Sequence, residues 1–213
     1  MATKGLLLVM SGPSGAGKGT LCQALLERRP NLRFSVSATT RPRRAGEVDG
    51  VHYFFLTEDE FREGITQGRF LEWARVYGHL YGTPLEGVRQ AVDSGVDVLL
   101  DLDIQGARQV KDKMPDAISV FISPPSLEAL RERIQRRGTE TDEESRLRLG
   151  AAITVMTAAR EFDYIIVNDD LSEAGLTLDA ILTAERARTS RHEDFLARFV
   201  GVWPGEMKGE KRG

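Results

Sequence analysis

The sequence contains few of the residues that build disulfide frameworks, metal centres or membrane spans. Among its 213 residues there is one cysteine, Cys22, which excludes a disulfide-stapled scaffold. Its three histidines, His52, His79 and His192, are scattered, without metal-ligand spacing or a Ser-His-Asp pattern. No apolar run reaches the roughly 18 residues of a transmembrane helix. The N-terminus also lacks a secretion signal, so we expect a cytoplasmic protein.

The chain also lacks a strong excess of charge of either sign. It carries 29 Lys and Arg against 32 Asp and Glu, which gives a net charge of −3. This balance favours neither a nucleic-acid partner nor an acidic membrane surface. The apolar fraction of 41% is ordinary for a globular protein, and the length suits one domain with insertions.

The most informative segment is the glycine-rich run SGPSGAGKGT at 11–20. It follows the apolar run 6–10 and precedes the helix-like run 21–26, the context in which G-x-x-x-x-G-K forms a phosphate cradle. Loop N–H groups and a helix N-terminus would face the anion, and Lys18 would add a positive charge. An ordinary tight turn is the alternative, but the spacing, the lysine and the flanks favour a nucleoside triphosphate site. The residues expected to bind this ligand are Gly12, Pro13, Ser14, Gly15, Ala16, Gly17, Lys18, Gly19 and Thr20.

One position departs from the usual form of this motif. Gly19 stands where Ser or Thr normally follows the lysine and ligates Mg²⁺, and Thr20 comes one residue later. Mg²⁺ would therefore be held through water and nucleotide phosphates or reached by Thr20, and we assign it no direct protein ligand.

Apolar runs alternate with helical patterns along the chain. Buried parallel strands are predicted at 6–10, 96–102, 118–122 and 164–167, with a less regular fifth at 34–37. Helices are predicted at 20–27, 85–94, 126–136 and 145–160. This alternation after a phosphate loop predicts an α/β fold with a three-layer parallel sheet.

Two stretches interrupt the alternation and are predicted insertions. The first, 37–82, holds most of the aromatic residues and strand-like pieces at 53–56 and 69–73. The second, 131–148, is dense in arginine and glutamate.

Residues 37–44 combine guanidinium and hydroxyl groups at the end of a predicted strand. Arg41 and Arg44 have the planar fork that binds phosphate through two hydrogen bonds. A solvated basic loop is the alternative. Beside a triphosphate loop, the pattern favours a second phosphate on an acceptor, to which Tyr53 and Tyr81 could donate.

Carboxylates occupy further candidate positions. Glu72 lies among apolar neighbours, where it could accept paired hydrogen bonds from the N–H and NH₂ edge of guanine; an exposed edge-strand glutamate is the alternative. Asp101 and Asp103 close an apolar run, and period-two geometry places both on one strand face. Ligands bind at such a strand end, where these carboxylates could orient an acceptor or hold hydrated Mg²⁺.

An arginine-rich cluster surrounds the turn at 138–141. Most of its members are expected to be solvated or paired with neighbouring glutamates, whereas one or two could reach a transferring phosphoryl group. The cluster consists of Arg131, Arg133, Arg136, Arg137, Arg146 and Arg148.

Together these segments resemble the guanylate kinase family. The resemblance rests on GPSGAGK at 12–18, SVSATTRPRRAGEVDGVHYFF at 35–55, FLEWARVYGHLYGT at 70–83, LDLDIQG at 100–106, PPS at 124–126, RRGTETDEES at 136–145 and VNDD at 167–170. It implies a P-loop kinase that transfers a phosphoryl group from ATP to GMP with Mg²⁺. It also implies a core at 1–36, 84–126 and 150–185, a GMP-binding region at 37–83, a helical lid at 127–149 and a tail at 186–213 that has no assigned role.

The same resemblance implies residue roles. The GMP phosphate is expected to be held by Ser37, Arg41, Arg44, Tyr53 and Tyr81, and the guanine by Glu72 and Thr83. Asp101 and Asp103 match acidic positions beside the acceptor and the metal, and Asn168 and Asp169 match the region near the adenine. Lys18, Arg41, Arg44, Arg137 and Arg148 are the expected catalytic residues, with Arg133 a further candidate.

Two other functions fit parts of the sequence. A non-catalytic guanylate-kinase-like module would bind a partner peptide, but such modules typically have a degraded phosphate loop and are attached to other domains. A P-loop kinase for another small phosphate would share GPSGAGK without the Glu72 and Tyr81 segments. Acceptor specificity separates these alternatives.

Overall fold

The computed structural model describes residues 4–136, 150 and 152–206. Its centre is a five-stranded sheet in the order β2-β7-β1-β8-β9, and every neighbouring pair is parallel. The strands are β1 (Leu7–Ser11), β2 (Leu32–Phe34), β7 (Asp97–Asp101), β8 (Ile118–Ser123) and β9 (Tyr164–Val167). The four main predicted strands are present within one residue at each end, and the predicted α/β class is confirmed.

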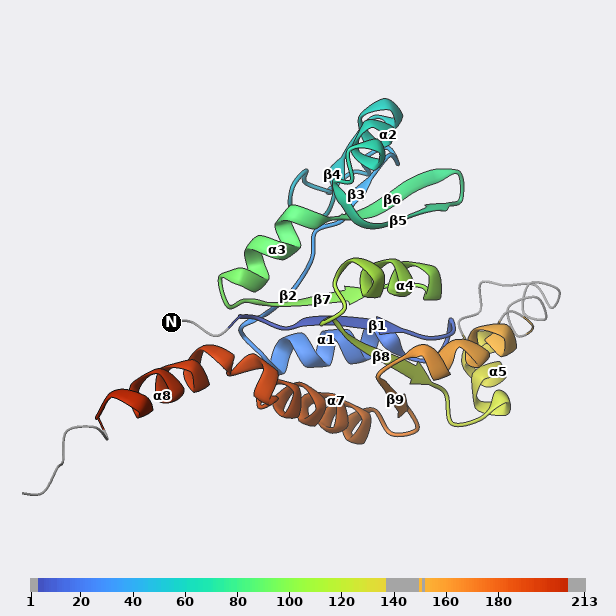
Figure 1. Cartoon of the computed structure of the whole chain (residues 1–213). Helices are drawn as coiled ribbons and strands as arrows, with labels where there is room; N and C mark the ends of the chain where they lie inside the picture. Colours follow the sequence, from blue (N-terminus) through green and yellow to red (C-terminus); the bar gives the residue numbers. More distant parts are fainter. Residues whose placement is uncertain (1–3, 137–149, 151, 207–213) are drawn as a thin grey trace, which may run out of the picture.

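Helices cover both faces of this sheet (Figure 1). Leu8 and Met10 of β1 face one core, packed by α1 (Lys18–Arg28) and α7 (Leu171–Arg186). Leu7 and Val9 face the opposite core, packed by α3 (Leu85–Asp93) and α4 (Ile104–Lys113). Successive residues of a strand point to opposite faces, so an uninterrupted apolar strand requires this three-layer arrangement.

Two predicted elements differ from the structure. The fifth strand was predicted at 34–37, but β2 ends at Phe34 and a new strand begins at Ala38. The reason is that Ser35 makes a last hydrogen bond to Leu99, after which the chain crosses to a second sheet. In the helix predicted at 145–160, residues 145–149 and 151 lie outside the described part. Residues 152–157 are α-helical, and a 3₁₀ turn, η1 (Ala158–Glu161), follows.

A second sheet of four strands lies beside the first, in the order β4-β3-β6-β5 (Figure 1). Its strands are β3 (Ala38–Thr39), β4 (Phe54–Phe55), β5 (Phe70–Val76) and β6 (His79–Pro84). Helix α2 (Glu58–Thr66) packs Phe61 against Phe70 with ring centres 4.2 Å apart. This small core, with Ala38 and Leu80, gives the second sheet apolar packing of its own.

The remaining helices follow β8 and β9. Helix α5 (Leu127–Arg136) packs Leu130 and Ile134 against Ala152. After α7 come η2 (Thr189–Arg191) and α8 (Glu193–Glu206), which extends away from the sheets (Figure 1). Of the helices that the structure describes, none has the length and apolar character of a membrane span. The division into core, GMP-binding region, lid and tail stays a prediction.

Candidate active site

The glycine-rich loop connects the central strand β1 to the start of α1. Gly12 has a φ of 141°, and a Cβ there would lie 2.2 Å from the carbonyl oxygen of Ile122. Gly17, with a φ of 90°, is the N-cap of α1 and has no side chain with which to cap it. The N-terminal N–H groups of α1 are therefore available to an anion, as the motif predicts.

Two side chains brace this loop. Lys18 donates from Nζ to the carbonyl oxygen of Gly12 at 2.7 Å, so its ammonium group lies against the loop. Asn168, which is 5% exposed, donates from Nδ2 to the carbonyl oxygen of Ala16 at 2.7 Å. The structure thus places Asn168 under the phosphate loop, whereas its neighbour Asp169 is exposed.

A cavity of about 240 Å³ lies between the carboxyl end of β7 and the second sheet. Four of the predicted substrate-binding residues line it: Ser37, Tyr53, Thr83 and Asp101. They come from segments far apart in the sequence, so the fold brings them together. His52, to which the sequence analysis gave no role, also lines this cavity, and its Nδ1 accepts from the backbone N–H of Val48 at 2.9 Å.

Arg41 is held beside this cavity by a carboxylate and aromatic rings. Its guanidinium donates to both oxygens of Glu47, at 2.9 and 2.7 Å, and lies 5.3 Å from the ring centre of Tyr53 and 5.7 Å from that of Phe55. The bond to Arg41 lowers the pKa of Glu47 to about 2, and the same bond raises the pKa of Arg41. Both groups are therefore charged across the physiological pH range.

The other predicted phosphate ligands lie next to Arg41. The ring of Tyr81 meets that of Tyr53 edge-on, with centres 6.1 Å apart. The backbone N–H of Arg44 donates to Glu47 at 2.7 Å, and the side chain of Arg44 is exposed. Glu47 therefore organises both arginines, a role that the sequence analysis missed. The available signal was an acidic residue placed shortly after three arginines.

Glu72 is buried, not solvated on an edge strand. It is 6% exposed, and its Oε1 accepts from the hydroxyl of Thr83 at 2.6 Å. Burial raises the pKa of Glu72, the bond from Thr83 opposes this, and the charge of Asp103 adds to it. A buried carboxylate with one oxygen engaged and hydrogen-bonding capacity remaining is suited to binding a paired donor edge.

The two aspartates after β7 are arranged differently from the prediction. Strand β7 ends at Asp101, and Asp103 is the N-cap of α4, accepting from the N–H of Gly106 at 2.7 Å. The prediction that both lie on one strand face is wrong because helix capping takes Asp103 out of the strand. Asp101 keeps contact with solvent but is partly desolvated, and this raises its pKa above the ordinary value. The positive charge of Lys18 opposes the rise without cancelling it. Lys18 and Asp101 thus interact electrostatically at the same sheet end.

The predicted lid arginines are only partly described. Arg137, Arg146 and Arg148 lie outside the described residues. Arg133 of α5 donates to the backbone carbonyl of Asn168 at 2.9 Å, which connects α5 to the segment that braces the phosphate loop.

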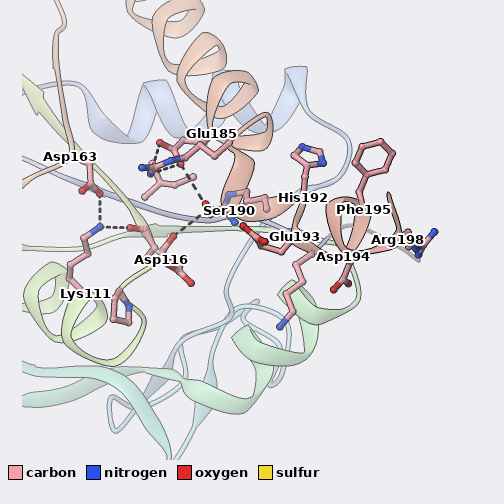
Figure 2. Close-up of a pocket in the computed structure, with 16 residues that line it drawn as sticks. Lys111, Asp116, Asp163, Glu185, Ser190, His192, Glu193, Asp194, Phe195 and Arg198 are labelled. Atoms are coloured by element: carbon pink, nitrogen blue, oxygen red, sulfur yellow. Dashed lines mark hydrogen bonds and ion pairs between the residues drawn. The ribbon is translucent and has the colours of Figure 1, made fainter. Parts of the chain in front are cut away.

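A larger cavity, of about 730 Å³, lies at the amino end of β8, beside η2 and α8 (Figure 2). Two pairs of its charged groups bond each other: Lys111 bonds Asp163 at 2.7 Å, and Arg188 lies 3.3 Å from Glu185. Open parallel sheets bind ligands at the carboxyl ends of their strands, where the glycine-rich loop lies. The smaller cavity lies at that end of β7 and is therefore the candidate active site.

Comparisons with known proteins agree with this geometry. Residues 4–185 match the family model described as guanylate kinase. The chain belongs to the guanylate kinase family. It is 54% identical to a guanylate kinase of Symbiobacterium thermophilum, with 89% of this chain and 90% of that protein covered. It is 50% identical to one of Caldanaerobacter subterraneus subsp. tengcongensis, with 92% and 95% covered.

A solved structure confirms the fold of the family. The crystal structure of guanylate kinase from Anaplasma phagocytophilum matches with a TM-score of 0.69 at 36% identity, covering 90% of this chain and 91% of that one. The assignment to guanylate kinase made from the sequence is confirmed. The roles of individual residues stay predictions.

Proposed function

We propose that the protein transfers the γ-phosphoryl group of ATP to GMP, giving ADP and GDP, with the residues described above in defined roles. The observation that carries this proposal is the cavity beside the end of β7, where Ser37, Tyr53, Thr83 and Asp101 converge. Glu72 joins this set through Thr83, and Arg41 joins it through Tyr53.

The ATP phosphates bind the glycine-rich loop. Its N–H groups and the N-terminus of α1 supply partial positive charge, and Lys18 supplies a full one next to the loop. Asn168 keeps the loop in shape from below, since its amide engages Ala16. Asp169 is exposed beside it, and we assign this residue to the adenine side.

GMP binds with its phosphate and its base held by different groups. Arg41 and Arg44 neutralise the phosphate, and the hydroxyls of Ser37, Tyr53 and Tyr81 donate to it. The carboxylate of Glu72 accepts from the guanine N–H and NH₂ groups, and the hydroxyl of Thr83 orients it through Oε1. Adenine presents an acceptor where guanine presents N–H, so the same carboxylate rejects AMP.

Transfer needs positioning and charge neutralisation, without a general base. The second pKa of a phosphate is about 6, so the acceptor oxygen is already largely ionised at neutral pH. Arg41, Arg44 and Lys18 then stabilise the charge of the transferring group. We propose that Arg137 and Arg148 of the lid add to this charge, with Arg133 fixing the base of the lid.

Mg²⁺ is proposed to arrive with ATP. The described residues include no cluster of three or more His, Cys, Asp or Glu side chains able to hold a metal by themselves. Thr20 is exposed in the first turn of α1, and Asp101 is exposed at the end of β7; both are candidate protein contacts, directly or through water. When bound, Mg²⁺ neutralises phosphate charge during transfer.

The test is the stoichiometry of the reaction. ATP and GMP are incubated with the protein, with and without a chelator of divalent cations, and ADP and GDP are separated and quantified. The proposal predicts equal amounts of ADP and GDP, and loss of both with the chelator. GMP binding without formation of either product would indicate a binding module, and ADP without GDP would indicate a hydrolase.

A further inference from the structure

The strand that carries Glu72 lies at the edge of its sheet. In the order β4-β3-β6-β5, strand β5 has β6 on one side, and within the described part of the chain no strand lies on the other. An edge strand has outward N–H and C=O groups that no strand bonds, and it is held less firmly than a central strand. The register of β5 against β6 also shifts between Phe70 and Glu72. Pairing with β6 alone therefore gives incomplete support to the residue proposed to read guanine.

Side chains from α4 bond the open edge of β5. The backbone N–H of Trp73 donates to Oε1 of Gln109 at 3.1 Å, and Nε2 of Gln109 donates to the carbonyl oxygen of Trp73 at 3.0 Å. Two opposed hydrogen bonds to one residue fix its position and its orientation, as a neighbouring strand would. Lys113 adds a third bond, from Nζ to the carbonyl oxygen of Phe70 at 2.8 Å. These contacts bracket Glu72.

The two bonding side chains, Gln109 and Lys113, lie on the same face of α4 as Gly106. Gly106, Gln109 and Lys113 are spaced by three and then four residues, which places them along one side of a helix. Gly106 faces Glu72, since a Cβ added to it would lie 3.2 Å from Oε2 of Glu72. Figure 1 shows α4 between the two sheets, next to β5. Helix α4 thus connects the parallel sheet to the strand that carries Glu72.

We propose that Gln109 is a positioning residue for guanine recognition. By holding the backbone of Trp73, it keeps the adjacent carboxylate of Glu72 at the distance from Thr83 and from the cavity that guanine requires. This inference rests on the proposed function. Gln109 does not line the cavity of about 240 Å³, so it acts through Glu72, which bonds the lining residue Thr83.

The test compares variants of the full-length protein. Gln109→Met preserves the length and helix propensity of the side chain and removes both hydrogen bonds. Gln109→Glu preserves the acceptor for the N–H of Trp73 and loses the donor. Gln90→Met is the matched control, because Gln90 is an exposed glutamine of α3 whose amide donates to Glu86 of the same helix at 2.8 Å. For each variant, kcat and KM are measured with GMP and with AMP, together with the thermal midpoint.

The proposal predicts that Gln109→Met raises the KM for GMP about tenfold, which corresponds to the loss of two modest hydrogen bonds. The ratio of kcat/KM for GMP to that for AMP falls by a similar factor, whereas kcat at saturating GMP changes little. Gln109→Glu falls between Gln109→Met and the wild type. Gln90→Met leaves KM, kcat and the preference unchanged.

Two results would overturn the proposal. One is an unchanged KM and base preference in Gln109→Met. The other is a lowered midpoint with equal losses towards GMP and AMP, which would make Gln109 merely structural. A wild-type protein that does not phosphorylate GMP would remove the proposed function itself and this inference with it.

Discussion

The amide of Asn168 bonds the carbonyl oxygen of Ala16 at 2.7 Å across 152 residues of sequence. This bond joins the end of β9 to the phosphate loop. Arg133 of α5 bonds Asn168 in turn, at 2.9 Å. The loop, the segment proposed to lie near the adenine and the base of the proposed lid therefore form one connected unit.

We predict that Asn168→Ala weakens ATP binding. Without the amide, the buried carbonyl of Ala16 loses its bond and the loop loses its brace, so the KM for ATP rises several-fold. The free energy of unfolding falls by about 1–3 kcal/mol, the cost of an unsatisfied buried polar group. Enzyme kinetics and denaturant unfolding measure the two effects. Asn31→Ala is the control, since it removes an exposed hydrogen bond to Gly95. Equal effects of the two variants on the KM for ATP would contradict the claim that Asn168 supports the phosphate loop.

Glu47→Gln tests the support of Arg41. Glutamine is uncharged and has a single acceptor oxygen, so it cannot hold both terminal nitrogens of the guanidinium. The KM for GMP should rise about tenfold, the cost of roughly one charge-assisted hydrogen bond, with a smaller effect on kcat. Glu58→Gln, which alters an exposed pair with Arg62 and Arg75, provides the comparison. An unchanged KM in Glu47→Gln would show that Arg41 does not depend on this carboxylate.

The same pair predicts a pH dependence of stability. The pKa of Glu47 is lowered from its ordinary value of 4.5 to about 2. The ionised carboxylate therefore stabilises the folded state fully above the unfolded value, and this contribution is lost as the pH falls towards 2. Unfolding curves should show a constant difference between wild type and Glu47→Gln above pH 5, which disappears at the acidic end. A difference that grows on acidification would contradict the assignment.

Glu72→Gln should raise the thermal stability of the protein and lower its preference for GMP over AMP. Burial raises the pKa of Glu72, because the ionised carboxylate is less stable inside the folded protein than in water. At neutral pH this buried charge therefore destabilises the folded state relative to the unfolded chain. Removing that charge should raise the thermal midpoint at pH 7 and above, and the advantage should shrink as the pH falls towards 4.5, the ordinary value. The preference for GMP over AMP should fall at least about a hundredfold, because the paired acceptors are lost. Retention of full preference would contradict the proposed role.

Gly19→Ser tests the departure in the phosphate loop. Gly19 lies in the first turn of α1, is exposed, and a Cβ there meets no atom within 4 Å. Serine should therefore fit and raise the free energy of unfolding by about 0.5 kcal/mol through helix propensity. Turnover should stay within a few-fold of wild type, with an altered Mg²⁺ requirement if the new hydroxyl reaches the metal. A large loss of turnover would mean that the reaction needs glycine at this position.

The sequence predicted the central sheet because strands that are apolar on both faces must be covered on both faces, which favours a parallel sheet between two layers of helices. The family resemblance named Glu72 and Thr83 separately as guanine-binding residues, and the hydrogen bond between them required the structure. The start of α4 was harder to predict, because an aspartate at position 103 is equally compatible with the end of a strand and with a helix N-cap. The capping bond to Gly106 decides between the two.

The supporting contacts could not be predicted, since they depend on packing between distant elements. Nothing in the sequence around Gln109 indicates its contact with Trp73. That contact depends on β5 being an edge strand, and composition and periodicity do not reveal strand order. Glu47 was hidden for a related reason: acidic residues in loops are usually solvated, and only the fold brings this one against Arg41. Asn168 was found by resemblance, but its bond to the phosphate loop required the structure.

The most direct test of the account is acceptor specificity. The protein, ATP and Mg²⁺ are combined with GMP, AMP, CMP, UMP or no acceptor, and ADP release is followed continuously. The account predicts rapid turnover with GMP and little with the other nucleotides or with none. Equal turnover with AMP, or silence with every nucleotide despite GMP binding, would contradict it.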